Sequence, residues 1–243
     1  MFVTEAVGRD WKGLYRIAGV TTIAMTLFFL GDTVVWIMLG PYPTSAQGWF
    51  ALLEQKRLVG LLLLSFPTFF GAILYYLTFL GLYHILRRVH PACAVLAALL
   101  AFVGLAILLV THPAYPMVYL SARHAAAATE TQRTLLLAAG ETRIAVAIAG
   151  GNLGGFLAEG AAVIFSLLML HSDVFGKGTA WLGLVGHGLD WTRLAMNLAF
   201  LPEWIGAILL MVGGLPQVIW LLLVAGRFLQ LGWGQSRTSE AAS

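Results

Sequence analysis

The stretch RIAVAIAGGNLGGFLAEGAAVIFSLLML, residues 143–170, decides the fold of this chain. It is long enough to cross a hydrocarbon core, which needs about 20 predominantly apolar residues. Glu159 stands within it. A charged side chain at the centre of a bilayer costs about 2.5–3.5 kcal/mol, so Glu159 is expected to face the interior of a helical bundle and to find a partner there. The stretch therefore predicts a transmembrane helix with one polar face.

The composition of the whole chain points the same way. Of its 243 residues, 60% are hydrophobic and 10% are charged, whereas soluble domains average about 45–50% apolar and about 25% charged residues. A water-soluble domain is thus excluded. The net charge of +3 comes without a basic stripe, which excludes a nucleic-acid-binding protein. Cys93 is the single cysteine, so intrachain disulfides and thiolate metal clusters are excluded as well.

Six apolar stretches predict an all-α, polytopic membrane bundle that forms a single domain over residues 1–243, with a polar tail at 235–243. The fifth stretch is the most polar, and it is included because Leu201–Trp204 forms a natural turn before the sixth. The six predicted spans are Leu14–Leu39, Leu58–Leu86, Ala92–Thr111, Arg143–Leu170, Ala180–Phe200 and Ile205–Phe228. Pro67 and Pro216 interrupt the second and sixth spans, as prolines in transmembrane helices often do.

The distribution of Lys and Arg predicts that both termini are cytoplasmic. Cytoplasmic connections of membrane proteins carry an excess of Lys and Arg. With both termini inside, eight basic residues lie on the cytoplasmic side and five on the outer side. The inner group is Arg9, Lys12, Arg16, Arg87, Arg88, Lys177, Arg227 and Arg237, and the outer group is Lys56, Arg57, Arg123, Arg133 and Arg143.

Two connections on the predicted outer side contain further helix signals. Ser45–Arg57 places apolar side chains on one face and polar ones on the other, which is typical of a helix that lies in the membrane interface. Thr129, followed three residues later by Gln132, is a capping-box pattern that opens a helix toward Gly140. These segments either cover the outer mouth of the bundle or serve as solvated connectors.

Glycines in the fourth span predict close packing against a neighbouring helix. Gly150 with Gly154, and Gly151 with Gly155, form two overlapping Gly-xxx-Gly pairs, which let a second backbone approach closely. Asn152 and Glu159, seven residues apart on this helix, share one face. We therefore expect this face to point inward.

Ionisable and amide side chains on the fourth and fifth spans, with one on the first, form the candidate ligand-binding site. At 1.5 Å per residue their depths suggest a ladder across the membrane. The predicted rungs are Asp32 with Arg193, Asn152 with Asp190, and Glu159 with His187, with Asn197 on the same face of the fifth span. The alternative is a polar network that fixes helix register without any chemistry.

Cofactor and metal sites have weaker signals. His84, His171 and His187 all fall in the cytoplasmic half, so two of them could hold a haem. A zinc-dependent hydrolase could be drawn from His187, Asp190 and Glu159, but their spacing matches no known zinc signature. No metal site is predicted.

Four stretches carry a resemblance to a known family. They are YRIAG at 15–19, YLSARHAAAAT at 119–129, QRTLLLAAGE at 132–141 and LMLHSDVFGKGTAWLG at 168–183. Together they resemble a family of bacterial integral membrane proteins that is catalogued only as a domain of unknown function. The resemblance implies a bacterial inner-membrane protein of about this size. It implies no reaction and no functional residues.

Three functions of different classes fit the sequence. The first is binding or movement of a small ligand, lipid or ion at the inward polar ladder. The second is an accessory subunit of a larger membrane complex, in which glycine-rich and aromatic faces make the contacts. The third is an intramembrane enzyme acting on a lipid or quinone.

Overall fold

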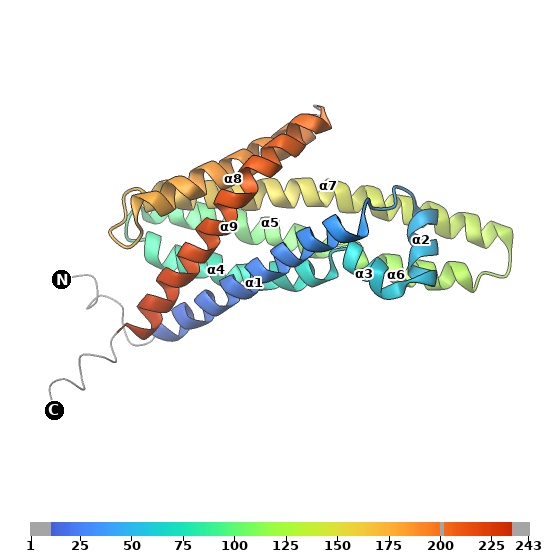
Figure 1. The fold of residues 1–243 in the computed structure, drawn as a ribbon, viewed down its shortest axis with the longest axis horizontal. Coiled ribbons are helices and arrows are strands. Elements are labelled where there is room, and N and C mark those ends of the chain that lie inside the picture. Colours follow the sequence, from blue (N-terminus) through green and yellow to red (C-terminus); the bar gives the residue numbers. More distant parts are fainter. Residues whose placement is uncertain (1–10, 200–201, 235–243) are drawn as a thin grey trace.

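The computed structural model describes residues 11–199 and 202–234, which form an elongated helical bundle (Figure 1). The helices of these residues are α1 (Lys12–Leu39), α2 (Ala46–Gln55), α3 (Arg57–Leu63), α4 (Phe66–Leu86), α5 (Pro91–Val110), α6 (Ala114–Ala125), α7 (Glu130–Met169), α8 (Lys177–Leu198) and α9 (Glu203–Trp233). The predicted all-helical class is confirmed for this part of the chain. The predicted polar tail, 235–243, lies outside the described residues.

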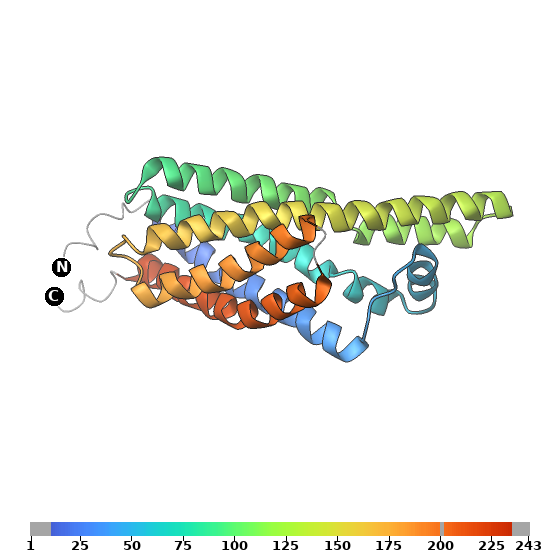
Figure 2. The ribbon, with the colours of Figure 1, turned by 90° about the horizontal axis from the view of Figure 1, so that it is seen from above.

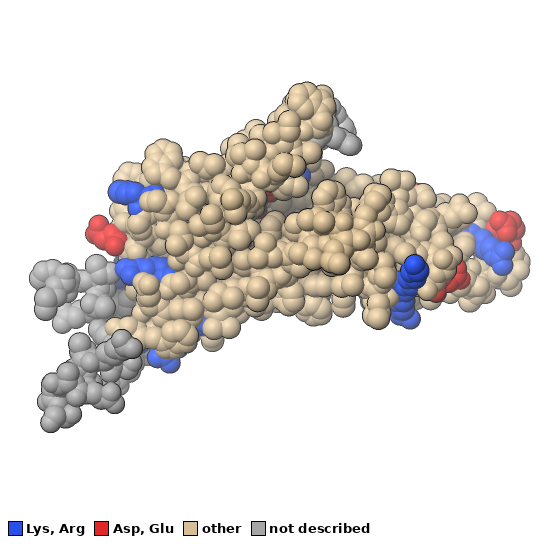
Figure 3. Space-filling model, in the orientation of Figure 1, with Lys and Arg blue, Asp and Glu red and all other residues tan. Residues whose placement is uncertain are grey.

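Five helical segments are long and apolar enough to cross a membrane: α1, α4, the run of α5 and α6, α7, and α9. On the face seen in Figure 3, most Lys, Arg, Asp and Glu side chains gather at the two ends, with a largely uncharged band between them. This is the pattern of a membrane protein. The fifth predicted span, Ala180–Phe200, corresponds to α8, which is not among the five apolar segments. Its polar residues, among them His187, Asp190 and Arg193, set it apart from the others.

Six helices form a closed ring in the order α1, α4, α5, α7, α8 and α9, each packed against the next, and α9 against α1 (Figures 1 and 2). Large side chains fill the inside of this ring, among them Phe79, Phe165 and Trp220, all wholly buried. The order matters for the site, because α7, α8 and α9 are consecutive whereas α1 and α8 are separated by α9.

The predicted second span, Leu58–Leu86, is wrong as a continuous helix. The chain leaves helical geometry at Leu64 and Ser65, and Ser65 adopts a left-handed conformation with φ of 54°. Pro67 lies in the first turn of α4, where its missing N–H costs no intrahelical hydrogen bond. The proline therefore opens a new helix here instead of kinking a long one.

The predicted outer helix that begins after Thr129 and the predicted span that begins at Arg143 are one 40-residue helix, α7. Its capping box is confirmed: the N–H of Gln132 donates to the Thr129 hydroxyl at 3.2 Å, and the Gln132 side chain accepts from the N–H of Ala128 at 3.1 Å. At 1.5 Å per residue α7 is about 60 Å long. It therefore projects beyond the rest of the bundle, with α6 beside it (Figure 2).

The amphipathic helix predicted at Ser45–Arg57 is present as α2, but its apolar face packs on protein. Trp49, Phe50 and Leu53 are buried in a second core together with residues of α3, α6 and α7. Glu141 of α7 accepts a hydrogen bond from the N–H of Ala46 at 2.7 Å, at the start of α2. We call α2, α3, α6 and the N-terminal third of α7 the outer cap, and 'outer' and 'inner' refer throughout to the sides predicted from the distribution of Lys and Arg.

Candidate functional site

The centre of the candidate site is a hydrogen-bonded group of three side chains from three helices. Nδ1 of His187 in α8 lies 2.6 Å from Oε2 of Glu159 in α7, and the amide nitrogen of Gln217 in α9 lies 3.1 Å from both carboxylate oxygens. The His187 side chain is wholly buried, and the Glu159 side chain is 14% exposed. The expected contact between Glu159 and His187 is therefore present.

The close approach of α8 and α9 positions this group of three side chains. A Cβ on Gly186 would lie 2.7 Å from the backbone nitrogen of Gln217, and a Cβ on Gly213 would lie 3.1 Å from the carbonyl oxygen of Gly186. The first distance leaves no room for a side chain, so position 186 needs glycine, and the second is tighter than an ordinary van der Waals contact. The two backbones thus meet directly beside His187, which brings Gln217 into reach of Glu159.

Hydrogen-bonding capacity restricts the protons in this group. An amide NH₂ only donates, so Gln217 needs Glu159 as an acceptor. The short contact between His187 and Glu159 then holds a single proton, either on Nδ1 of the imidazole or on the carboxyl group. In both arrangements the pair stays bonded. A proton can therefore move between Nδ1 of His187 and the Glu159 carboxylate without any movement of the helices.

Two further polar pairs lie toward the outer side of this group. Nε of Arg193 donates to Oδ1 of Asp190 at 2.5 Å, one turn apart on α8. The side-chain amide of Asn197 donates to Oδ1 of Asn152 on α7 at 3.3 Å. We call these two pairs together with Glu159, His187 and Gln217 the polar column.

Two rungs of the predicted ladder are wrong. Arg193 pairs with Asp190 instead of Asp32, and Asn152 pairs with Asn197 instead of Asp190. The physical reason is adjacency: α9 separates α1 from α8 in the ring, whereas residues three apart on one helix always lie within reach of each other.

Asp32 stands apart from the column, in the outer half of α1. The hydroxyl of Thr68 in α4 donates to its Oδ2, and its Oδ1 is buried without a hydrogen-bond partner. Burial raises the pKa of Tyr42 in the following loop, and the negative charge of Asp32 raises it further. Asp32 is thus a separate outer carboxylate.

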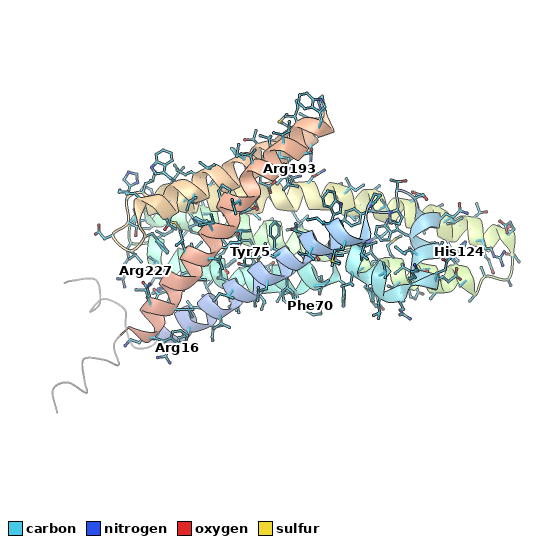
Figure 4. All side chains as sticks on the ribbon, in the orientation of Figure 1. Arg16, Phe70, Tyr75, His124, Arg193 and Arg227 are labelled. Carbon is cyan, nitrogen blue, oxygen red and sulfur yellow. The ribbon has the colours of Figure 1, made fainter. Side chains whose placement is uncertain are left out.

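The surface is recessed at the base of the arm formed by α8 and α9. In Figure 3 acidic and basic atoms are visible in this recess, within an otherwise uncharged surface. Figure 4 places Arg193 on the arm at this level and Tyr75 of α4 on the bundle side. Tyr75 interacts electrostatically with Glu159. Asp190 and Arg193 are partly exposed at the surface of the bundle, with side chains that are 13% and 21% exposed.

The predicted packing glycines have different environments. A Cβ on Gly154 would lie 2.7 Å from the carbonyl oxygen of Gly104, and one on Gly150 would lie 2.2 Å from the Thr111 hydroxyl, so these two face α5. Gly155 faces Leu194 of α8, at 3.1 Å. The expectation for Gly151 is wrong, because nothing lies within 4 Å of a Cβ there.

The three histidines proposed for haem have separate neighbours. Nδ1 of His84 lies 2.6 Å from the Tyr15 hydroxyl, with the Trp11 ring stacked at 3.8 Å. His187 is bonded to Glu159, and His171 lies against the carbonyl of its own helix at the inner end of α7. Among the described residues no group of three or more His, Cys, Asp or Glu is placed to hold a metal ion. Each of the three histidines thus has a different hydrogen-bonding partner.

Sequence reasoning missed Gln217. It is the only amide side chain in the predicted span Ile205–Phe228, directly after Pro216. That isolation in an apolar run was a usable signal, because polar side chains within membrane helices usually face a bundle interior.

Comparisons with known proteins found no relative of this chain. No family model, no curated protein and no solved structure matches the chain. The functional argument therefore rests on the geometry of the polar column.

Proposed function

We propose that this chain is a protein of the bacterial cytoplasmic membrane that binds, and moves, a small cation at the polar column. Of the small ligand, lipid or ion expected from the sequence, a cation suits the charges best. Glu159 and Asp190 carry two negative charges when ionised, and Arg193 carries one positive charge. With His187 neutral, the column lacks one positive charge. That imbalance, inside a bundle of apolar helices, is the observation that carries the proposal.

The position of the column supports a path across the membrane. Asn152 and Glu159 are seven residues apart on α7, which corresponds to about 10 Å along the helix axis. The Asp190–Arg193 pair lies on α8 between Asn197 and His187. The recess below the α8–α9 arm gives access from one side. From the predicted outer end of α7 and α8, the column presents amide oxygens first and carboxylate oxygens farther in.

The same proposal includes α8 as the sixth span, with both termini cytoplasmic. α8 has 22 residues, about 33 Å, and it packs between two apolar helices. Its polar side chains pair with α7, α9 and one another, so they need not contact lipid. An even number of spans returns the C-terminus to the side of the N-terminus, which agrees with the excess of Lys and Arg expected there.

The experiment is thermal unfolding of the purified protein in detergent, titrated with Na⁺, with K⁺ and with protons. A ligand at 100 times its Kd stabilises the folded state by about 2.7 kcal/mol, which corresponds to roughly 5–10 °C for a chain of this size. We expect one of these cations to raise the Tm of the wild type and not that of Glu159→Gln.

Asp32→Asn is the matched control, because it removes an intramembrane carboxylate outside the column. It should keep the cation response. Equal responses of wild type and Glu159→Gln to all three cations would contradict the proposal.

A second candidate function, an accessory subunit of a larger membrane complex, is favoured by the outer cap. Tyr115, Tyr119 and Leu135 on its α6–α7 hairpin are 79%, 52% and 66% exposed. Exposed aromatic side chains on a projecting hairpin are typical of protein contacts. A photo-crosslinking residue at position 115, compared with one at the exposed Trp181 at the other end of the bundle, tests this in native membranes. Specific adducts at 115 alone support a partner at the cap, and adducts at neither position contradict it.

A further inference from the structure

A cavity of about 540 Å³ lies between α6 and α7 in the outer cap. Sites for small molecules in proteins are typically clefts of about 300–1,000 Å³ with apolar walls and a few polar groups. Figure 2 shows the two helices side by side where they project beyond the rest of the bundle. The lining of the cavity ends on α7 at Leu136, whereas the polar column begins at Asn152, about 24 Å farther along the helix. The cavity is therefore separate from the candidate cation site.

The walls of this cavity are largely aliphatic. Ala122 and Ala126 line it from the side of α6, and Leu135 and Leu136 line it from the side of α7. Both alanines and Leu135 are exposed, so part of this apolar surface remains open to solvent. The lining residues of α6 extend from Tyr119 to Ala126, which is about 10 Å along the helix axis. An elongated cleft with aliphatic walls suits an alkyl chain.

The polar side chains that line the cavity offer hydrogen-bond donors. Nη1 of Arg123 donates to the Tyr119 hydroxyl at 3.1 Å, and the guanidinium carbon lies 5.9 Å from the centroid of the Tyr119 ring. A guanidinium has more N–H donors than this bond uses, and the Tyr119 hydroxyl keeps its own proton for another acceptor. The side-chain oxygen of Gln132 accepts from the N–H of Ala128 at 3.1 Å, so its NH₂ group is the end that can bond to a ligand. Three donor groups thus line one cavity.

These donors select a ligand that is an anion. Among the described residues that line the cavity none is acidic, so no carboxylate of the lining offsets the charge of Arg123. Hydrogen bonds from arginine to a carboxylate are charge-assisted and frequently bidentate. An inorganic anion alone would leave the aliphatic walls uncovered, and an uncharged chain would leave the guanidinium without a counter-ion. An anion with an alkyl chain matches both parts of the lining.

We propose that the cavity between α6 and α7 binds a free fatty carboxylate of medium chain length. The carboxylate bonds to Arg123 and Tyr119, and the alkyl chain lies against the alanines and leucines of the two helices. The outer cap projects beyond the ring of six helices, which favours entry of the ligand from the aqueous phase (Figure 2). This inference goes beyond the proposed function and does not depend on it, because the cavity and the polar column share no residue.

The test is calorimetric titration of the full chain with octanoate, after reconstitution into phosphatidylcholine nanodiscs. Empty nanodiscs measure the partition of octanoate into lipid, which is subtracted. Acetate has the carboxylate without the chain, and octanamide has the chain without the charge. We expect saturable binding of octanoate and at least several-fold weaker binding of both control compounds. A photoactivatable analogue of octanoate should then label peptides from α6 and from the N-terminal third of α7.

Two matched pairs of variants locate the site. Arg123→Gln removes the charge of the cavity and should weaken octanoate binding several-fold. Its control, Arg133→Gln, removes the same charge from a residue of the cap that does not line the cavity, and it should leave the affinity unchanged. Ala126→Phe places a ring in the cavity and should abolish most of the binding, whereas Ala128→Phe, outside the lining, should not. Both alanines are exposed, so neither ring disturbs a core.

Several outcomes would overturn the inference. They are an absence of saturable octanoate binding, equal affinity of wild type and Arg123→Gln, equal affinity for octanamide and octanoate, and photo-adducts confined to the ring of six helices.

The other possible occupant of the cavity is a partner protein, which a photo-crosslinking residue at position 126 detects in native membranes. Polypeptide adducts there, with no octanoate binding by the purified protein, overturn the inference and support the accessory-subunit function. Glu159→Gln should bind octanoate like the wild type, so the cavity and the cation site can each fail without the other.

Discussion

Nδ1 of His187 in α8 lies 2.6 Å from Oε2 of Glu159 in α7, although the two residues are 28 apart in sequence. Each of these residues would be costly in a bilayer without the other. Their contact holds α7 and α8 in one register, and Gln217 ties α9 to the same point. The polar centre of the bundle is therefore also a structural junction, so substitutions there should alter stability and ion binding together.

The first prediction concerns this junction. Glu159→Leu and His187→Leu should each destabilise the protein, because each removes the short contact and leaves the other buried partner with Gln217 alone. The double variant should lose less than the sum of the two, with a coupling of about 0.5–3 kcal/mol. Reversible unfolding in mixed micelles measures all three variants. Strict additivity would show that the two side chains do not interact.

The second prediction concerns the other ion pair of the column. Asp190→Asn and Arg193→Gln should be coupled, because the two side chains are bonded and largely buried. Asp32→Asn and Arg193→Gln should be additive within about 0.3–0.5 kcal/mol, since Asp32 bonds to Thr68 and lies on a helix that does not adjoin α8. Double-mutant cycles measure the coupling energy of both pairs. Coupling between positions 32 and 193 would restore the arrangement expected from the sequence.

These pairings show which parts of the site the sequence could predict. Periodicity identified the polar faces of α7 and α8, and equal depth matched Glu159 with His187. Depth alone could not match Asp32 or Asn152, because it says nothing of which helices adjoin. Adjacency is set by packing between distant segments, such as the contact of Gly186 with Gln217. The break at Ser65 was missed for a similar reason, since Pro67 is compatible both with a kinked helix and with a new start.

The third prediction distinguishes two glycines of α7 that are three residues apart, Gly151 and Gly154. Gly154→Leu should strongly destabilise or misassemble the bundle, because even a Cβ there would lie 2.7 Å from the backbone of α5. Gly151→Leu should leave the yield and the Tm in detergent nearly unchanged, because its Cβ meets open space. The two variants add the same side chain to the same helix, less than one turn apart, at positions with different surroundings. Gly151→Leu is therefore the control. Equal losses in both would place the α5–α7 contact elsewhere.

The last prediction concerns the orientation of the bundle. In a Cys93→Ala background, a cysteine at the exposed Thr44, which precedes the outer cap, should react in intact cells with a reagent that cannot cross the membrane. A cysteine at Arg88, between α4 and α5 at the opposite end, should react only after the cells are opened. The reason is the excess of Lys and Arg at that end, which favours the cytoplasmic side. A cysteine at Ser236, in the tail beyond α9, should behave like that at Arg88 if α8 crosses the membrane. Labelling of Ser236 but not Arg88 from outside would mean that α8 does not span the membrane.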